Sequence, residues 1–215
     1  YELGRQPFGI ASPAAWLRRA GADVEVADVS LQPFPEPSVR QADLVAFHLP
    51  MHTATRLAIP LAERARALNP GVHLCFYGLY AQINEQYLRE LGECTILGGE
   101  FESGLSDLCE RIQSGMQASN TSSRKSLERQ HFLTPDRSGL PDLGEYAELQ
   151  IDPLNRKTVG YTEATRGCKH LCRHCPVVPV YNGKFRIVQR EVVLEDIRQQ
   201  VEQGAAHITF GDPDF

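Results

Sequence analysis

The chain has 215 residues, of which 42% are hydrophobic, and its 22 basic and 27 acidic residues give a formal net charge of −5. That length allows one large domain or two small ones with an ordinary core. The acidic balance argues against a nucleic-acid surface, and no apolar run is long enough for a membrane span or signal peptide. The six cysteines show no disulfide rhythm, so we expect a protein of the reducing cytoplasm.

The first half of the chain alternates predicted helices and strands. Ser12-Pro13 is typical of a helix start. Further helices are expected at 53–68, at 84–92 and around 105–112, and strands at 24–29, 44–49, 72–77 and 94–97. We expect residues 1–3 to be the remnant of a truncated first strand. The alternation predicts a parallel, doubly wound α/β sheet.

Parallel sheets bind ligands beyond the carboxyl ends of their strands. The candidate ligand-binding residues at these ends are His48, Leu49, Tyr77, Gly78, Gly98, Gly99 and Glu100. Glycines there allow a bulky ligand to approach the backbone closely. No G-x-G-x-x-G sequence follows a strand, which argues against a dinucleotide. For His48 we favour a polar residue at a loop end over a metal ligand.

The second half begins with a polar stretch. Residues 114–129 are small and polar and predict a flexible connection, followed by an extended segment at 133–142 that Tyr146 anchors. A strand at 159–164, a helix at 191–203 and a strand at 207–210 then predict a β-α-β unit.

Three cysteines lie close together directly after the predicted strand at 159–164. Cys168, Cys172 and Cys175 fall within eight residues, as a soft metal or an iron–sulfur cluster requires. Nearby cations, among them Arg166 and Lys169, favour the thiolate form. The alternatives are a disulfide with a spare thiol, or a zinc site that a nearby histidine completes. The remaining cysteines, at positions 75, 94 and 109, stand singly and are expected to be buried thiols.

The spacing C-x-x-x-C-x-x-C after a glycine resembles the cluster loop of the radical SAM superfamily. The resemblance implies that the three cysteines hold a [4Fe-4S] cluster whose fourth iron binds S-adenosylmethionine (SAM). His174 stands where that superfamily often has a carbocyclic aromatic residue. The ending Gly211-Asp212-Pro213-Asp214 resembles its second-strand motif. The resemblances of the loop and of this ending together imply that His174, Gly211, Asp212 and Asp214 contact SAM.

The first half resembles the cobalamin-binding domain found in one branch of that superfamily. The run Gly98-Gly99-Glu100-Phe101-Glu102 is similar to the G-E-x-E element that closes such domains. The Asp-x-His-x-x-Gly motif is absent, so the resemblance implies a corrinoid bound without a protein histidine on cobalt. The chain also resembles a subgroup named for a CUAEP or CCAEP tail, which would lie beyond residue 215.

Together these resemblances imply a cobalamin-binding-like Rossmann domain at 1–115, a linker at 116–157 and the start of a truncated radical SAM (β/α) barrel at 158–215. The expected activity is reductive cleavage of SAM to begin radical chemistry, with methyl transfer or rearrangement as outcomes if cobalamin is present. The implied partners are a small-molecule or peptide substrate and a reductant such as ferredoxin or flavodoxin, and the fragment alone is expected to be inactive. The alternative is a non-catalytic metal- or corrinoid-binding module with a zinc or electron-transfer iron–sulfur site.

Overall fold

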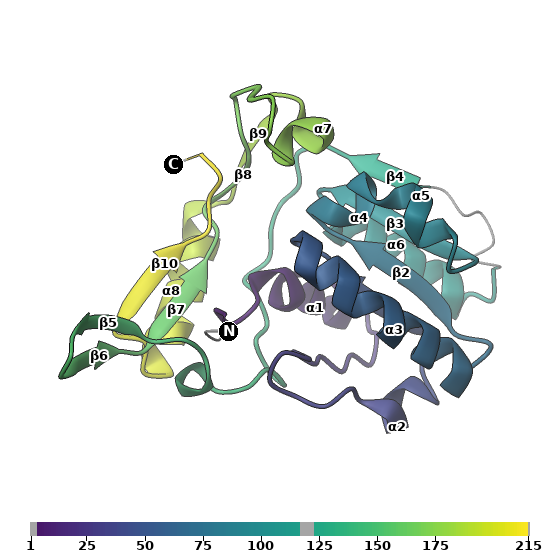
Figure 1. Ribbon diagram of the computed structural model, residues 1–215, viewed down its shortest axis with the longest axis horizontal. Helices are drawn as coiled ribbons and strands as arrows, with labels where there is room; N and C mark the ends of the chain where they lie inside the picture. The colour runs from purple at the N-terminus through teal and green to yellow at the C-terminus, as the bar shows by residue number, and fades with distance from the viewer. Residues whose placement is uncertain (1–3, 117–122, 215) are drawn as a thin grey trace.

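A computed structural model describes residues 4–116 and 123–214 of the protein. Figure 1 shows two lobes. The first holds a parallel sheet between helices, and the second is built from β5 to β10 with α8. Within the described residues, no helix is both long and apolar enough to cross a membrane.

The first lobe is organised around a four-stranded parallel sheet. Its strands are β1 (Leu44–His48), β2 (His73–Tyr77), β3 (Cys94–Gly99) and β4 (Ser123–Ser126), and they are neighbours in that order. The strands predicted at 44–49, 72–77 and 94–97 are confirmed, because unbroken apolar runs suit strands that are covered on both faces.

Helices cover both faces of this sheet. On one face α3 (His52–Leu68) packs on Leu74, Phe76 and Ile96. On the other face α6 (Glu102–Gln113) packs on Cys75, Tyr77 and Leu97, and α1 (Phe8–Arg19) lies against α6. The short helices are α2 (Glu36–Val39), α4 (Leu79–Ile83) and α5 (Glu85–Arg89). The doubly wound arrangement is therefore confirmed.

Helix α1 begins four residues before the predicted start at Ser12. Pro13 lies inside the helix and has no N–H to offer the carbonyl of Gly9. The Tyr77 hydroxyl donates to that carbonyl instead, at 3.0 Å, and the Ser12 hydroxyl donates to Glu102 at 2.8 Å. The sequence Ser12-Pro13 was thus misread as a helix cap, because the residues that stabilise this turn, Tyr77 and Glu102, lie far away in the sequence.

The strand predicted at 24–29 is wrong. Residues 22–28 are neither helix nor strand, although their side chains alternate between half-buried and exposed from Ala22 to Val26. A strand forms only when a neighbouring strand accepts its hydrogen bonds, and β1 is an edge of the described sheet. The expected remnant strand at 1–3 lies outside the described residues.

The stretch expected to be a linker takes part in the fold. It supplies β4 and then a segment that runs to the short 3-10 helix η1 (Leu143–Glu145). Tyr146 anchors this segment as predicted, since its hydroxyl donates to Asp28 at 3.0 Å. Arg137 in the same segment is buried and pairs with Asp196 at 2.9 Å.

The second lobe contains the predicted β-α-β unit. Strands β7 (Val159–Thr162) and β10 (His207–Phe210) are parallel, and α8 (Arg190–Glu202) packs against β7. The strand predicted at 159–164 ends at Thr162. The chain then forms β8 (Thr165–Gly167), which pairs with β9 (Phe185–Ile187) and not with β10. The other elements are the hairpin β5 (Leu149–Asp152) and β6 (Asn155–Lys157), and α7 (Val177–Tyr181).

The Arg137–Asp196 pair gives the first prediction. Arg137 donates to both carboxylate oxygens of Asp196 and to the carbonyl of Tyr161. Asp196→Asn leaves a buried guanidinium without its counter-charge, so we expect the free energy of unfolding in urea to fall by about 3 kcal/mol. Glu195→Gln, which breaks the exposed pair with Arg198 on the same helix, should change it by less than about 0.5 kcal/mol. Equal losses in the two variants would contradict the prediction.

Candidate functional site

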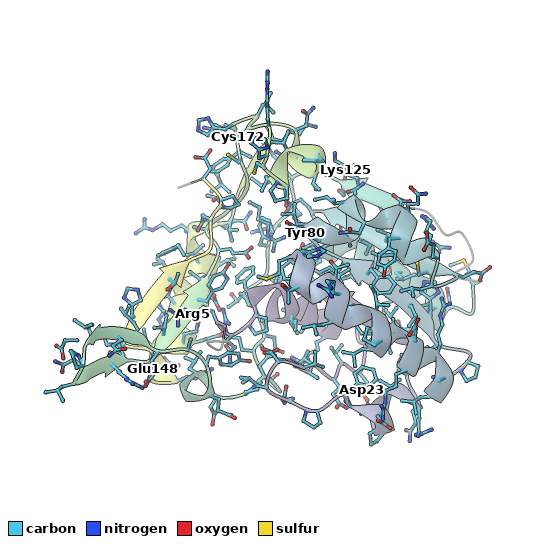
Figure 2. The ribbon with its side chains drawn as sticks, in the orientation of Figure 1. Arg5, Asp23, Tyr80, Lys125, Glu148 and Cys172 are labelled. Atoms are coloured by element: carbon cyan, nitrogen blue, oxygen red, sulfur yellow. The ribbon has the colours of Figure 1, made fainter. Side chains whose placement is uncertain are left out.

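The three predicted cluster ligands lie on the loop between β8 and α7. Cys168 and Cys175 are half-buried against Val180 and Tyr181, and Cys172 is exposed at the tip of the molecule (Figure 2). All six cysteines are free thiols, so the disulfide alternative is not realised. In the described part of the chain, no three His, Cys, Asp or Glu side chains are gathered closely enough to hold a metal ion. The loop therefore carries all three thiols but does not close them around one point.

The backbone of this loop suits thiolate ligands. Gly167 has φ +73°, and a Cβ atom there would lie 2.3 Å from the Lys184 carbonyl oxygen and 2.5 Å from the Tyr181 ring. Only glycine fits this approach, which explains the glycine before Cys168. The backbone N–H of His170 donates to the Cys168 sulfur at 3.4 Å. Soft donors and an N–H directed at sulfur fit an iron–sulfur cluster.

Two of the predicted SAM-contacting residues hold the end of β10 against the cluster loop. Asp212 accepts hydrogen bonds from the hydroxyl of Thr165 and, at 3.1 Å, from the N–H of Ala164. Asp214 accepts from the N–H of Lys169 at 3.3 Å. Two carboxylates therefore lie beside the segment that carries the cysteines.

The other two predicted SAM residues occupy different surroundings. The N–H of Gly211 donates to the carbonyl of Thr162 at 2.9 Å, and the Tyr161 ring fills the space where a Cβ of Gly211 would be. His174 is exposed on the cluster loop.

The predicted corrinoid-side residues gather at the carboxyl ends of β1, β2 and β3. Gly78 and Gly99 have φ +100° and +71°. A Cβ on Gly99 would lie 2.1 Å from the Ser126 carbonyl oxygen, and one on Gly98 would meet the Gln82 side chain. Close backbone approach at this edge thus serves internal packing.

His48 lies within an aromatic stack at this edge. Its ring centroid is 5.2 Å from that of Tyr77 and 6.1 Å from that of Phe101. Burial, reinforced by the charge of Arg166, lowers the pKa of His48 to about 4. The imidazole is therefore neutral at physiological pH and packs as an aromatic ring.

The side chains of Leu49, Tyr77 and Glu100 are buried. Leu49 belongs to the core beneath α3, and Tyr77 is engaged with Gly9. Glu100 accepts a hydrogen bond from the Tyr181 hydroxyl at 3.1 Å. At these three positions the strand ends are fixed by internal contacts.

A buried charge cluster joins the two lobes. Arg166 of β8 donates to Glu102 at 2.6 and 2.9 Å, and its guanidinium also lies 3.4 Å from Glu100 and 3.2 Å from Glu163. The same guanidinium lies over three rings, with centroid distances of 5.7 Å to Phe8, 5.0 Å to Phe101 and 4.9 Å to Phe132. We call Arg166 with Glu100, Glu102 and Glu163 the Arg166 cluster.

The carboxylates of the Arg166 cluster do not share the positive charge equally. For Glu102, burial raises the pKa, but the charge of Arg166 and hydrogen bonds from Arg166, Ser12 and Gln130 outweigh it, so the pKa is lowered. Burial dominates at Glu100 and Glu163, raising both pKa values, that of Glu163 to about 7. Among the three glutamates, Glu102 therefore forms the strongest ion pair with Arg166.

The sequence reading missed the Arg166 cluster. It placed Arg166 among the cations beside the thiols, but the side chain is buried among glutamates. Glu163 and Glu100 follow β7 and β3 directly, and Glu102 begins α6. The sequence feature that could have indicated this cluster is the combination of acidic residues after strands with an arginine just before the cysteines.

Known proteins resemble this chain in both sequence and structure. No family model matches it. Hopanoid C-3 methylase of Methylococcus capsulatus is 26% identical over 220 residues, which cover 94% of this chain and 42% of that protein. The tRNA-2-methylthio-N(6)-dimethylallyladenosine synthase of Chlorobium phaeovibrioides is 40% identical over 60 residues, 27% of this chain and 13% of that protein.

Among solved structures, the radical SAM methyltransferase TsrM of Kitasatospora setae matches with a TM-score of 0.68 and 14% identity. One TsrM structure holds tryptophan and a SAM analogue, and the match covers 99% of this chain and 46% of that one. The other holds cobalamin and a [4Fe-4S] cluster. These likenesses confirm the Rossmann-like fold and the resemblance to cobalamin-binding radical SAM proteins. The chain spans less than half the length of hopanoid C-3 methylase and of TsrM.

The raised pKa of Glu163 gives a prediction for stability against pH. Because its folded pKa of about 7 exceeds the ordinary 4.5, the folded state binds more protons between these values, and stability falls as pH rises through this window. Glu163→Gln removes that penalty. We expect the thermal unfolding midpoint of this variant to match that of the parent protein near pH 4.5 and to exceed it at pH 8. The expected gain in the free energy of unfolding at pH 8 is about 1 to 3 kcal/mol.

Glu191→Gln serves as the matched control, since Glu191 is an exposed carboxylate of the same lobe. Its difference from the parent protein should not change over the same pH range. A Glu163→Gln variant that is less stable than the parent at pH 8 would show that the ion pair with Arg166 outweighs burial.

Proposed function

We propose that this chain is the corrinoid-side and cluster-bearing part of a radical SAM enzyme that transfers methyl groups. The observation that carries the proposal is the C-x-x-x-C-x-x-C loop, attached by the Arg166 cluster to the strand ends of a cobalamin-type sheet. Likeness to a methylase over 94% of the chain and to TsrM over 99% supports it.

In this proposal Cys168, Cys172 and Cys175 each bind one iron of a [4Fe-4S] cluster, and the fourth iron is left for SAM. When bound, the cluster supplies the electron that cleaves SAM and so starts radical chemistry. The chain's own contribution is to direct the N–H of His170 at the Cys168 sulfur and to keep one coordination position free of protein ligands. Exposure of Cys172 leaves the loop accessible for cluster insertion.

The carboxylates beside the loop provide the SAM contacts that we propose. Asp212 and Asp214 lie within hydrogen-bond distance of the segment from Ala164 to Lys169. A carboxylate is a strong partner for an ammonium group or a ribose diol. Gly211 makes room for the Tyr161 ring beside these carboxylates, and His174 presents a ring from the loop.

The strand ends carrying Gly78, Gly98 and Gly99 form the corrinoid side of the proposed site. The His48 ring is stacked on Tyr77 and lies close to Phe101, which supports a corrinoid bound without a protein nitrogen on cobalt. The TsrM structure that holds cobalamin supports the presence of this cofactor. Hopanoid C-3 methylase and the methyltransferase TsrM match nearly the whole chain, which favours methyl transfer over rearrangement. A small-molecule or peptide substrate and a ferredoxin or flavodoxin complete the proposal.

Metal content tests the cluster assignment. After anaerobic reconstitution we expect about four irons and four sulfides per chain, with an electron paramagnetic resonance spectrum that SAM alters. Cys172→Ala removes one of three ligands and should lower iron content by more than about half. Cys109→Ala, which changes a thiol on α6 outside the loop, should leave it unchanged. Stoichiometric zinc without sulfide would instead support a non-catalytic metal-binding module.

Cobalamin binding tests the other half of the proposal. We expect the protein to retain hydroxocobalamin, and His48→Gln to leave the visible spectrum of the bound corrinoid unchanged, because the ring, stacked on Tyr77, is not a cobalt ligand. Gly78 has φ +100°, and a Cβ atom added there would lie 3.2 Å from the Leu49 carbonyl oxygen. Gly78→Val should therefore distort the strand end and weaken corrinoid binding about tenfold. A spectral shift in His48→Gln would contradict the assignment.

A further inference from the structure

The segment that carries the cluster loop has an excess of positive charge. Six of the 22 basic residues and none of the 27 acidic residues lie between positions 164 and 190, from the start of β8 to the start of α8. The six are Arg166, Lys169, Arg173, Lys184, Arg186 and Arg190. Because the whole chain has a net charge of −5, this stretch locally reverses its charge.

Only part of this charge is used inside the fold. Arg166 is buried among glutamates, and Arg186 donates to a backbone carbonyl. Lys169, Arg173 and Lys184 are exposed, and in the part of the chain that the structure describes their side chains pair with no carboxylate. Exposed arginines elsewhere do have such partners, as in the pairs Arg64–Glu36, Arg124–Asp107 and Arg198–Glu195. The positive charge of the loop is therefore available to a partner.

Contacts between the cluster loop and β9 bring these exposed residues together. The Lys169 ammonium lies 5.2 Å from the Phe185 ring centroid, and Lys184 directly precedes Phe185. A Cβ atom on Gly183 would lie 3.4 Å from the Leu171 side chain and 3.6 Å from the Lys169 carbonyl oxygen. Leu171 nevertheless remains 62% exposed. An apolar side chain thus lies on the surface beside two unpaired lysines.

The first lobe adds a further cation at the same end of the molecule. Lys125 of β4 is exposed, and its ammonium group donates to the carbonyl of Pro179 in α7 at 2.8 Å. Figure 2 shows Lys125 and the exposed Cys172 at this end. We call the surface formed by Lys125, Lys169, Leu171, Arg173 and Lys184 the cationic tip.

A surface of this composition favours one class of partner. Unpaired cations attract an acidic protein over a long range and so speed its encounter. A single exposed apolar side chain among them suits a small, transient interface. The proposed reaction needs an electron from outside the chain for each SAM that is cleaved, and electron transfer slows steeply with distance. Cys172 is the exposed one of the three proposed cluster ligands, so a short route to the cluster starts at the cationic tip.

We propose that the cationic tip is the docking surface for a small acidic electron-transfer protein. The inference rests on the proposed cluster function and assigns the surface through which electrons reach that cluster. The docked carrier loses one electron and the cluster gains it, so no covalent bond forms or breaks in this step. Both lobes contribute to the surface, since Lys125 belongs to the first lobe and the other four residues to the second.

Titration calorimetry of the reconstituted protein with flavodoxin, an acidic carrier, tests the charge of this surface. Lys184→Glu reverses one charge of the cationic tip and should raise the Kd for flavodoxin about tenfold at about 50 mM NaCl. Lys157→Glu makes the same change in net charge on the exposed hairpin of β5 and β6, and should raise the Kd by less than about twofold. The difference between the variants should shrink at about 300 mM NaCl, because salt screens exposed charges.

Leu171→Ala tests the apolar part of the surface. The side chain is mostly exposed, so the variant should fold like the parent protein. Its Kd for flavodoxin should rise about fivefold at both salt concentrations, because salt does not screen the loss of an apolar contact.

Electron transfer should follow the same order as binding. At flavodoxin concentrations below the Kd, fully reduced flavodoxin should form its semiquinone about tenfold more slowly with Lys184→Glu than with the parent protein. Reduction of the cluster by dithionite, a small molecule that needs no docking surface, should be equal in the two proteins.

Three outcomes would overturn the inference. The first is an equal effect of Lys184→Glu and Lys157→Glu, and the second is flavodoxin binding that does not change with salt. The third is a tRNA probe that binds more tightly than flavodoxin and is lost in Lys184→Glu, which would assign the cationic tip to RNA phosphates. Iron and sulfide counts on the same samples separate this inference from the proposed function. With a cluster present, these outcomes reject only the docking surface, whereas absence of a cluster rejects both.

Discussion

The arrangement of the two lobes depends on the burial of one guanidinium group. Arg166 lies on β8 in the second lobe. Its partners Glu100 and Glu102 lie between β3 and the start of α6 in the first lobe, and Glu163 follows β7. A buried charge destabilises a protein strongly unless opposite charges surround it. The lobes must therefore meet at this point, and the cluster loop, which starts two residues after Arg166, takes its position from it.

The far end of the cluster loop is fixed to the same lobe. Tyr181, which ends α7, donates to Glu100, and the ammonium group of Lys125 on β4 donates to the carbonyl of Pro179. The loop with the three cysteines is thus held at both ends against the strand ends where we propose the corrinoid. Its own residues at positions 169–174 stay exposed, so the anchors are rigid while the ligand-bearing tip is open. This division suits a loop that must receive a cluster.

Local patterns predicted much of this fold and little of its long-range bonding. Apolar runs located β1, β2 and β3, and periodicity located α3 and α8, because burial on a sheet face is visible in a short window. The cysteine spacing was equally local. Arg166 was misassigned because its partners lie 64 and 66 residues away. The strand at 24–29 failed for a related reason, since a strand depends on a neighbour that its own residues do not specify.

In the proposed cluster site, three cysteines bind the cluster and no protein atom binds the fourth iron. Pulsed electron–nuclear double resonance of the reduced, reconstituted protein measures this directly. Two samples are needed, one with SAM carrying a ¹⁵N-labelled amino group and one with ¹⁵N-labelled histidine. We expect hyperfine coupling from the SAM nitrogen and none from histidine. Coupling from His170 or His174, with none from SAM, would contradict it.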